Sequence, residues 1–319
     1  MLPSLRNAYV AMPSLALAAA ATGLAWRSSN ESDGSSAPMN TGWRMLATQA
    51  FADAKPAKTG ALDPQEFKSF VLIEKEKLTH NTLRLRFELP NNQVSGLNVA
   101  SCLVTKAVMG EGAEAKPVVR PYTPTSAPDA RGYMDLVVKV YPTGNMSKHM
   151  GNLKVGDSLE MKGPIPKIPY QANMKKQIGM VAGGTGLTPM LQVIDAVLAN
   201  PADTTKVSLL YANLTPGDII LKARLDALAA KHADRLKVTY IVDKPGWGGL
   251  FWPGLVGRVN KEVLQKTMPP PDPANMVLVC GPPGFMTAVS GNKAKDFTQG
   301  ELEGALKELG YNSSQVYKF

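Results

Sequence analysis

The sequence predicts a mixed α/β protein in which an N-terminal antiparallel β-barrel is followed by a parallel-sheet α/β domain. Short runs of alternating apolar and polar residues, separated by turns, occupy residues 65–172, a pattern typical of a barrel. From residue 173 to 319, buried-strand patterns alternate with helical ones, the order that gives a parallel sheet with right-handed crossovers. The 319 residues, 44% of them hydrophobic, are enough for two cores.

The first 64 residues differ in composition from the rest. Residues 1–30 contain Arg6 and Arg27, no acidic residue, and an alanine-rich apolar stretch at 9–26, which is typical of a mitochondrial targeting segment. We expect a mitochondrial location, in a membrane or in the intermembrane space, and leave open whether the segment is cleaved or anchors the chain, because Pro13 and the small side chains weaken it as a membrane span. A secretory signal is the alternative, and the scarcity of cysteine opposes it. Residues 31–64 are predicted to be a linker.

Within the barrel region, TLRLRFELP (82–90) is the clearest strand, because leucines and Phe87 alternate with polar side chains. Turn-prone His80 and Asn81 separate it from the preceding strand. The barrel is expected to close near Tyr170. The other predicted strands are FKSFVLIEKEKL (67–78), LNVASCLVTKAV (97–108), MDLVVKVY (134–141) and DSLEMKGP (157–164).

In the C-terminal region, IGMVAGG and NMVLVCGPP have the mainly apolar pattern of buried strands in a parallel sheet. The predicted strands are IGMVAGG (178–184), VSLLYAN (207–213), LKVTYIVD (236–243), NMVLVCGPP (275–283) and QVYKF (315–319). The predicted helices are LTPMLQVIDAVLAN (187–200), GDIILKARLDALAAKHA (217–233), NKEVLQKTM (260–268) and QGELEGALKELG (299–310), the last ending at Gly310.

Charge and cysteine usage narrow the function classes. The formal net charge of +9 is consistent with a solvated basic surface or with docking to an acidic protein. A nucleic-acid binder is not favoured, since no basic run is interleaved with aromatic residues. The two cysteines, Cys102 and Cys280, lie in apolar strand patterns, and the three histidines are far apart in sequence. We therefore expect neither a disulfide framework nor a metal site.

The segment RPYTPTS (120–126) has the residue types that hold a flavin. The guanidinium of Arg120 offers a permanently charged fork for a pyrophosphate. The ring of Tyr122 is suited to cover part of an isoalloxazine, and Thr123 to hydrogen-bond its edge. Pro121 and Pro124 stiffen the segment. The alternative is a proline-rich strand edge with an ordinary surface arginine.

Two glycine turns precede predicted helices. YPTGNMS (141–147) places free N–H groups at a helix start, which suits a pyrophosphate, or is a plain capping turn centred on Ser147. GGTGLTP (183–189) lies where a buried strand meets a helix, and its three glycines permit close approach of a ligand. It is not a Walker loop, because no lysine follows the last glycine, and a simple glycine turn is the alternative.

CGPPG (280–284) ends another buried strand, at the edge of a parallel sheet where ligands bind. Cys280 either packs as a small core residue or lies beside a nicotinamide ring. No general base accompanies it, so we do not expect a nucleophile.

These segments, taken in order, resemble NADH–cytochrome b5 reductase, a member of the ferredoxin–NADP reductase-like flavoproteins. The resemblance covers residues 67–319 and is closest to the mitochondrial branch, including SGNKAKDFTQGELEGALKELGY (290–311). It implies a flavin-binding barrel, a nucleotide-binding α/β domain, FAD and NADH as cofactors, and cytochrome b5 or a similar acidic haem protein as acceptor. The matching segments are RPYTPTS, LVVKVY, GNMS, GGTGLTPMLQVIDA, YANLTPGDI, VCGPPG and VYKF.

The resemblance also implies a set of site residues. For FAD the implied residues are Arg120, Pro121, Tyr122, Thr123, Val137, Lys139, Tyr141, Gly144, Asn145, Met146, Ser147, Thr185 and Thr188. For the nicotinamide nucleotide they are Gly184, Thr185, Asp243, Cys280, Gly281 and Pro282, and Phe319 is a further cofactor contact. Thr123, Thr188 and Cys280 are the implied catalytic residues. The family often has lysine where this chain has Asn145, which puts one charged phosphate contact in doubt.

The implied chemistry is hydride transfer from NADH to the flavin, followed by single-electron transfer to a separate haem protein. A carboxylate at Asp243 favours a ribose diol over a 2′-phosphate, hence NADH over NADPH, although Lys244 softens that repulsion and a plain strand-end turn is the alternative. Two other interpretations stay open: a related flavin reductase for a quinone, ferric chelate or ferredoxin, and a non-catalytic subunit of a membrane assembly. We expect a monomer.

Overall fold

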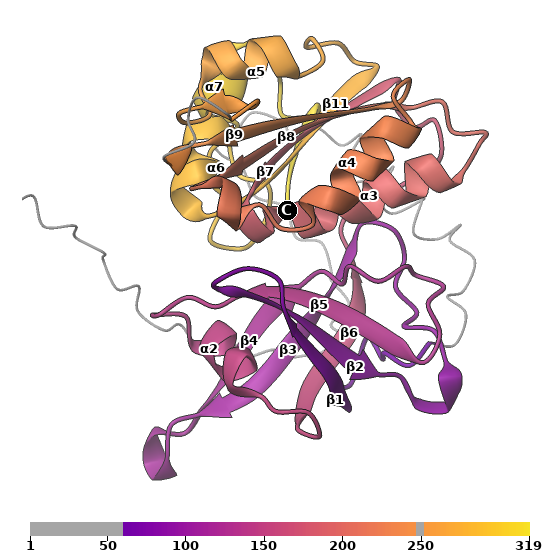
Figure 1. Cartoon of the computed structure of the whole chain (residues 1–319), viewed down its shortest axis with the longest axis vertical. Coiled ribbons are helices and arrows are strands. Elements are labelled where there is room, and N and C mark those ends of the chain that lie inside the picture. The colour runs from indigo at the N-terminus through magenta and orange to yellow at the C-terminus, as the bar shows by residue number, and fades with distance from the viewer. Residues whose placement is uncertain (1–59, 247–251) are drawn as a thin grey trace, which may run out of the picture. The chain divides into compact units, whose positions relative to one another are not determined.

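The computed structural model of the protein describes residues 60–246 and 252–319. The predicted targeting segment (1–30) and the predicted linker up to residue 59 lie outside the described residues. Figure 1 shows the described chain as a group of strands in indigo to magenta and a second sheet flanked by helices in pink to yellow. We call residues 60–172 the barrel domain and the remainder the α/β domain.

The barrel domain is an antiparallel sheet of six strands in the order β4-β3-β6-β1-β2-β5, so the predicted antiparallel architecture is confirmed. Just beyond β4, the N–H of Thr125 donates to the carbonyl of Asp135 in β5 at 2.9 Å, which brings the two outer strands together. One apolar cluster, which includes Leu85, Phe87 and Leu103, forms the core. The strands are β1 (Lys68–Lys77), β2 (Thr82–Glu88), β3 (Ser101–Met109), β4 (Lys116–Tyr122), β5 (Tyr133–Lys139) and β6 (Ser158–Pro166).

Several features of the barrel domain differ from the sequence-based expectation. Ala61 and Leu62, which the sequence assigns to the linker, are buried in the barrel core, and their N–H groups donate to the carbonyls of Val94 and Ser95. The sequence predicts β4 only as the alternative for RPYTPTS, because two prolines weaken its strand pattern. The shorter elements are η1 (Pro90–Asn92), η2 (Gly112–Glu114) and α2 (Asn145–Asn152).

The alternation of side chains along β5 explains how the two domains share a surface. Leu136 and Val138 belong to the barrel core, whereas Val137 belongs to the apolar cluster of the α/β domain. Successive side chains of a strand point to opposite faces, so Lys139 lies on the same face as Val137. β5 also contacts η3 (Gly184–Gly186) of the α/β domain.

The α/β domain is a parallel sheet in the order β10-β9-β8-β7-β11-β12, which confirms the predicted parallel sheet. Its strands are β7 (Gln177–Gly183), β8 (Lys206–Asn213), β9 (Leu236–Val242), β10 (Leu255–Val256), β11 (Asn275–Cys280) and β12 (Val316–Lys318). Its helices are α3 (Leu187–Ala199), η4 (Pro216–Asp218), α4 (Lys222–Lys231), α5 (Lys261–Thr267), α6 (Pro283–Val289) and α7 (Gly304–Glu308).

Two predicted helices were too long. α4 begins at Lys222 rather than near residue 217, because Thr215 and Asp218 close a capping box around η4 and Leu221 has a left-handed φ of 55°. α7 is short because Gly304 also has a positive φ, of 62°, and the preceding residues form a loop instead. The strand β10 and the helix α6 were not predicted, since two residues are too few to show a period and CGPPG looks like a turn.

Among the described residues, none of the helices has both the length and the apolar character needed to cross a bilayer. Within residues 60–246 and 252–319, no cluster of His, Cys, Asp and Glu side chains is arranged to hold a metal ion.

Candidate functional site

The candidate site lies along the edge of the parallel sheet where the strands end. Because the strands are parallel, their carboxyl ends share one edge, the usual ligand-binding edge of such sheets. The register places Asn213 beside Val242, Gly183 beside Ala212, Cys280 beside Ala182, and Lys318 beside Val279. The predicted residues Asp243, Gly184, Cys280 and Phe319 therefore follow one another along this edge.

The turn GGTG combines an open surface with a tight contact. Gly184 has a φ of +55°, and within the described part of the chain no atom lies within 4 Å of where a side chain would begin. A Cβ on Gly186 would lie 2.5 Å from the carbonyl carbon of Cys280 and closer still to its oxygen, so this glycine lets the turn pack directly on CGPPG. The hydroxyl of Thr188 donates to the carbonyl of Thr185 at 3.2 Å and fixes the start of α3. The structure thus brings GGTG and CGPPG together, as predicted.

Cys280 is a half-buried residue at the end of β11. Burial raises its pKa to about 12, so the sulfur stays protonated at neutral pH. A protonated thiol is a weak nucleophile, which agrees with the expectation that Cys280 does not attack a substrate. The next residue, Gly281, packs under Phe285, because a Cβ there would overlap the ring of that residue. Pro282 is exposed at the start of α6.

On the barrel side, Arg120 and Tyr122 lie on the edge strand β4. Arg120 is exposed, and its guanidinium donates to the carbonyl of Val119 at 2.8 Å. The hydroxyl of Thr105 in β3 donates to the carbonyl of Arg120 at 3.1 Å and fixes the main chain there. Tyr122 is half-buried, and burial raises its pKa to about 12, so its ring is neutral. Pro121 is exposed and Thr123 is half-buried, which leaves both accessible to a ligand.

The second barrel segment, GNMS, forms the start of α2 as predicted. Gly144 is the N-cap and makes no side-chain bond, so the first N–H groups of the helix point outward. Ser147 is buried, and its hydroxyl accepts from Tyr141 N–H at 3.2 Å and donates to Gly144 C=O at 3.3 Å. The hydroxyl therefore closes its own turn, as the alternative interpretation expected, and main-chain N–H groups, Asn145 included, are left for an anion. Met146 is buried in the barrel core.

Lys139 forms a buried ion pair across the two domains. Its ammonium lies 3.0 Å from Oδ1 of Asp218, with side-chain exposures of 14% and 5%. Asp218 also accepts from Thr215 through Oδ2, at 2.7 Å from the hydroxyl. Burial acts to raise the pKa of Asp218, but the hydrogen bonds from Thr215 and Lys139 outweigh it and hold the pKa below its usual value. The sequence did not reveal this partner, since the two residues are 79 positions apart.

At the other end of the sheet edge, Asp243 follows β9. Its N–H donates to the carbonyl of Asn213 at 3.1 Å, and its Oδ2 lies 3.6 Å from Nε of Arg258. Arg258 is 89% exposed and was not predicted, because its position depends on the short strand β10. The side-chain amide of Asn213 is buried and has no hydrogen-bond partner within the described part of the chain. At this edge of the sheet, the nitrogen and oxygen of the Asn213 amide therefore remain unpaired with any described residue.

Phe319 completes the edge next to β11. Its N–H donates to the carbonyl of Val279 at 3.0 Å, and its ring meets that of Tyr317 edge-on at 5.2 Å between centroids. Gln299 accepts from the N–H of Lys318 at 2.6 Å and donates to its carbonyl at 3.0 Å. The strand that precedes Phe319 is therefore held by main-chain pairing with β11 on one side and by the side-chain amide of Gln299 on the other.

The donors assembled here fit two dinucleotides. On the barrel side, a guanidinium and a helix start suit a pyrophosphate, and a half-buried tyrosine suits a flat ring. On the α/β side, the open surface at Gly184 and the carboxylate of Asp243 suit a second nucleotide. The contact between β5 and η3 joins the two sets.

Two family models match the chain in adjacent ranges. Residues 69–170 match the oxidoreductase FAD-binding domain, and residues 180–291 match the oxidoreductase NAD-binding domain. The chain is 50% identical over 274 residues to an NADH-cytochrome b5 reductase-like protein of Arabidopsis thaliana, covering 84% of this chain and 82% of that one. It is 48% identical over 272 residues to NADH-cytochrome b5 reductase 2 of Aspergillus oryzae, covering 85% and 83%.

Solved structures give the same result for the fold. The cytochrome b5 reductase domain of Ulva prolifera nitrate reductase matches with a TM-score of 0.71 and 33% identity, covering 82% of this chain and 100% of that one. The CS-b5R domains of human Ncb5or match with a TM-score of 0.63 and 22% identity, covering 80% and 69%. The second similarity is one of fold alone.

Proposed function

This chain belongs to the NADH–cytochrome b5 reductase family, and on that premise we propose that it transfers electrons from NADH, through FAD, to a cytochrome b5. The observation that carries the proposal is the contact between β5 and the turn η3. β5 belongs to the range that matches the FAD-binding domain, and η3 belongs to the range that matches the NAD-binding domain. Their contact supports the proposal, because hydride transfer requires the two cofactors to lie next to each other.

Bound FAD supplies the conversion between a hydride pair and single electrons. The chain's own residues hold and orient the reactants. We assign Arg120 and the first N–H groups of α2 to the pyrophosphate, and Tyr122 with Thr123 to the flat ring. The open surface of Gly184 admits the second ring beside it, and the turn is kept rigid by the bond from Thr188 to Thr185. The thiol of Cys280 stays protonated.

The electron acceptor is tested with the purified protein. We expect a yellow protein that bleaches with NADH under anaerobic conditions. It should reduce purified cytochrome b5 faster than a quinone, a ferric chelate or a ferredoxin at the same ionic strength, and added salt should slow that reaction because opposite charges steer the encounter. A colourless protein that does not take up FAD would contradict the proposal. A yellow protein that prefers a quinone or ferredoxin would favour the alternative reductase.

Replacing Arg120 with alanine is expected to weaken FAD binding by about 10- to 150-fold, because a charge-assisted hydrogen bond is worth roughly 1.5–3 kcal/mol. The measurement is titration of the apoprotein with FAD. Lys116→Ala is the control, since Lys116 is an exposed cation on the same strand and should leave the affinity unchanged. Equal FAD affinity in the two variants would remove Arg120 from the pyrophosphate site.

Replacing Asp243 with alanine is expected to raise kcat/KM for NADPH relative to NADH by about tenfold, because the carboxylate that repels a 2′-phosphate is gone. Arg258→Ala should shift the ratio in the opposite direction, since it removes the cation 3.6 Å from that carboxylate. The measurement is steady-state kinetics with both nucleotides. If the ratio of kcat/KM for NADPH to that for NADH stays constant in both variants, the ribose 2′-position of the nucleotide does not lie near Asp243.

We also propose a mitochondrial location, supported by the basic, acid-free composition of residues 1–30. Imaging of the full chain with a C-terminal fluorescent fusion, compared with a chain lacking residues 1–30, tests it. Equal distribution of the two would count against it.

A further inference from the structure

Gln192 connects the two domains through its side-chain amide. It lies in the second turn of α3 and is 8% exposed. Its Oε1 accepts from the N–H of Ser101 at 3.2 Å, and its Nε2 donates to the carbonyl of Pro124 at 3.3 Å. Both partners are main-chain groups of the barrel domain, 91 and 68 positions away in the sequence. The amide is thus committed at both ends to the other domain.

The two anchor points lie at one end of the β3–β4 ladder. Ser101 is the first residue of β3, Pro124 comes just after β4, and Leu103 pairs with Tyr122 between them. This end of the ladder carries Thr123, the residue assigned to the edge of the flavin. Gln192 therefore holds the main chain that positions Thr123.

On the α/β side, Gln192 is one helical turn from Thr188. Residues four apart lie on the same face of a helix, so the two side chains are linked by a rigid unit. Thr188 is itself bonded to the GGTG turn through Thr185. One turn of α3 therefore connects Gln192, which bonds the barrel domain, to Thr188, the residue assigned to the other side of the flavin edge.

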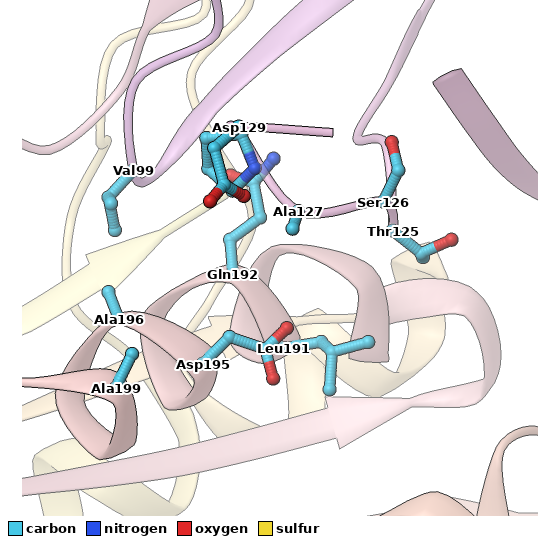
Figure 2. A pocket seen from close by; sticks show the side chains of 11 residues that line it. Val99, Thr125, Ser126, Ala127, Asp129, Leu191, Gln192, Asp195, Ala196 and Ala199 are labelled. Carbon is cyan, nitrogen blue, oxygen red and sulfur yellow. The ribbon is translucent and has the colours of Figure 1, made fainter. Parts of the chain in front are cut away.

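Apolar packing alone does not fix this part of the domain contact. A cavity of about 160 Å³ lies between α3 and the barrel segment 125–129, and Gln192 is one of its lining residues. Figure 2 shows the Gln192 side chain reaching from α3 toward that segment. The neighbouring link is exposed: Arg224 bonds Asp195 at 2.7 Å and the carbonyl of Thr125 at 3.4 Å. The buried amide is therefore the rigid connection beside the cavity.

Building on the proposed function, we propose that Gln192 is a positioning residue that sets the orientation of the α/β domain against the barrel domain at the flavin edge. Two hydrogen bonds from one planar amide to two different segments fix the rotation of the α/β domain relative to the barrel domain as well as the distance between them. Hydride transfer depends steeply on both.

The test compares three variants of the FAD-loaded protein. Gln192→Leu removes both bonds. Gln192→Glu is nearly the same size and keeps the acceptor for Ser101, but an ionised carboxylate has no proton to donate to Pro124. Gln315→Leu is the control, because Gln315 is also buried and its side-chain oxygen accepts within the α/β domain, from the N–H of Asn312 at 2.9 Å.

We measure the visible circular dichroism of the oxidised bound flavin and the rate of anaerobic bleaching at saturating NADH. Gln192→Leu should change the dichroism and slow bleaching by about 10- to 100-fold. The NADH concentration for half-maximal rate should change less than about threefold, because binding contacts are intact. Gln192→Glu should fall between Gln192→Leu and wild type, and Gln315→Leu should lose thermal stability without either change.

Wild-type dichroism and bleaching in the Gln192 variants would overturn the inference. If Gln192→Leu does not fold, Gln192→Glu decides. If NADH does not bleach the wild-type protein, the proposed function fails, and the dichroism of Gln192→Leu against Gln315→Leu still decides the role of Gln192.

Discussion

Replacing Gly186 with alanine is expected to lower the free energy of unfolding by about 3 kcal/mol or more and to slow bleaching by NADH. The added Cβ would lie 2.5 Å from the carbonyl carbon of Cys280 and closer still to its oxygen, a clash with main chain rather than with a movable side chain. Overpacking of this kind costs roughly 1–3 kcal/mol where side chains can move, and backbone is stiffer. Relief of the clash must separate GGTG from CGPPG, the two segments that we assign to the nicotinamide.

Urea unfolding measures the loss of stability, and Gly284→Ala is the matched control. Gly284 lies in α6, and no atom of residues 60–246 or 252–319 is within 4 Å of the point that its Cβ would occupy. Alanine favours a helix over glycine by about 1 kcal/mol, so this variant should be unchanged or slightly more stable. If Gly186→Ala behaves like Gly284→Ala, the close contact with Cys280 is wrong.

The second large effect is expected for Lys139→Met. Removing one partner of a buried ion pair leaves the other charge uncompensated, which typically costs about 3–5 kcal/mol. Asp218, 5% exposed, would keep its bond from Thr215 but lose its cation. Lys222→Met is the control, since Lys222 and Asp226 are 41% and 46% exposed, and exposed pairs contribute less than about 1 kcal/mol. Equal losses in the two variants would show that Lys139 and Asp218 are not a buried pair.

The pH dependence of the same variant gives an independent check. In the wild type the pKa of Asp218 is lowered, so its contribution to stability is present above its unfolded pKa, near 4, and is lost as pH falls further. Without Lys139, burial is opposed only by the hydrogen bonds from Thr215 and by His80, whose Nε2 lies 3.9 Å from Oδ1 of Asp218, and the pKa of Asp218 rises. The carboxyl then takes up a proton under mildly acidic conditions. The stability difference between wild type and Lys139→Met should therefore shrink from about pH 7 to about pH 5.

Local patterns in the sequence predicted most of the fold. The alternation in TLRLRFE gave β2 with its bounds nearly unchanged, and GGTGLTP was correctly placed between a buried strand and a helix. The prediction was poorer where proline or glycine hides a period, as in β4 and at the start of α6. There the residue types that shape a ligand segment also remove the strand or helix signal.

The sequence indicated the segments of the candidate site but not the contacts between residues that are distant in the sequence. Arg120, Cys280 and Gly184 could be proposed from the sequence because each lies in a segment with its own chemistry. Asp218, Arg258 and Gln192 were missed as partners, because each matters through a residue distant in the sequence. A periodic pattern tells which face of an element is apolar and does not tell which other element meets it.

The edge strand β4 has a consequence for the behaviour of the protein in concentrated solution. The backbone nitrogens of Pro117, Val119 and Pro121 lie on the same side of the strand, because every second residue faces the same way. Proline is tolerated at such positions where its nitrogen faces away from the neighbouring strand. Of these three positions only Val119 has a hydrogen to offer to an incoming chain. The two prolines therefore hinder pairing of β4 with an edge strand of another molecule, which would be the first step of aggregation.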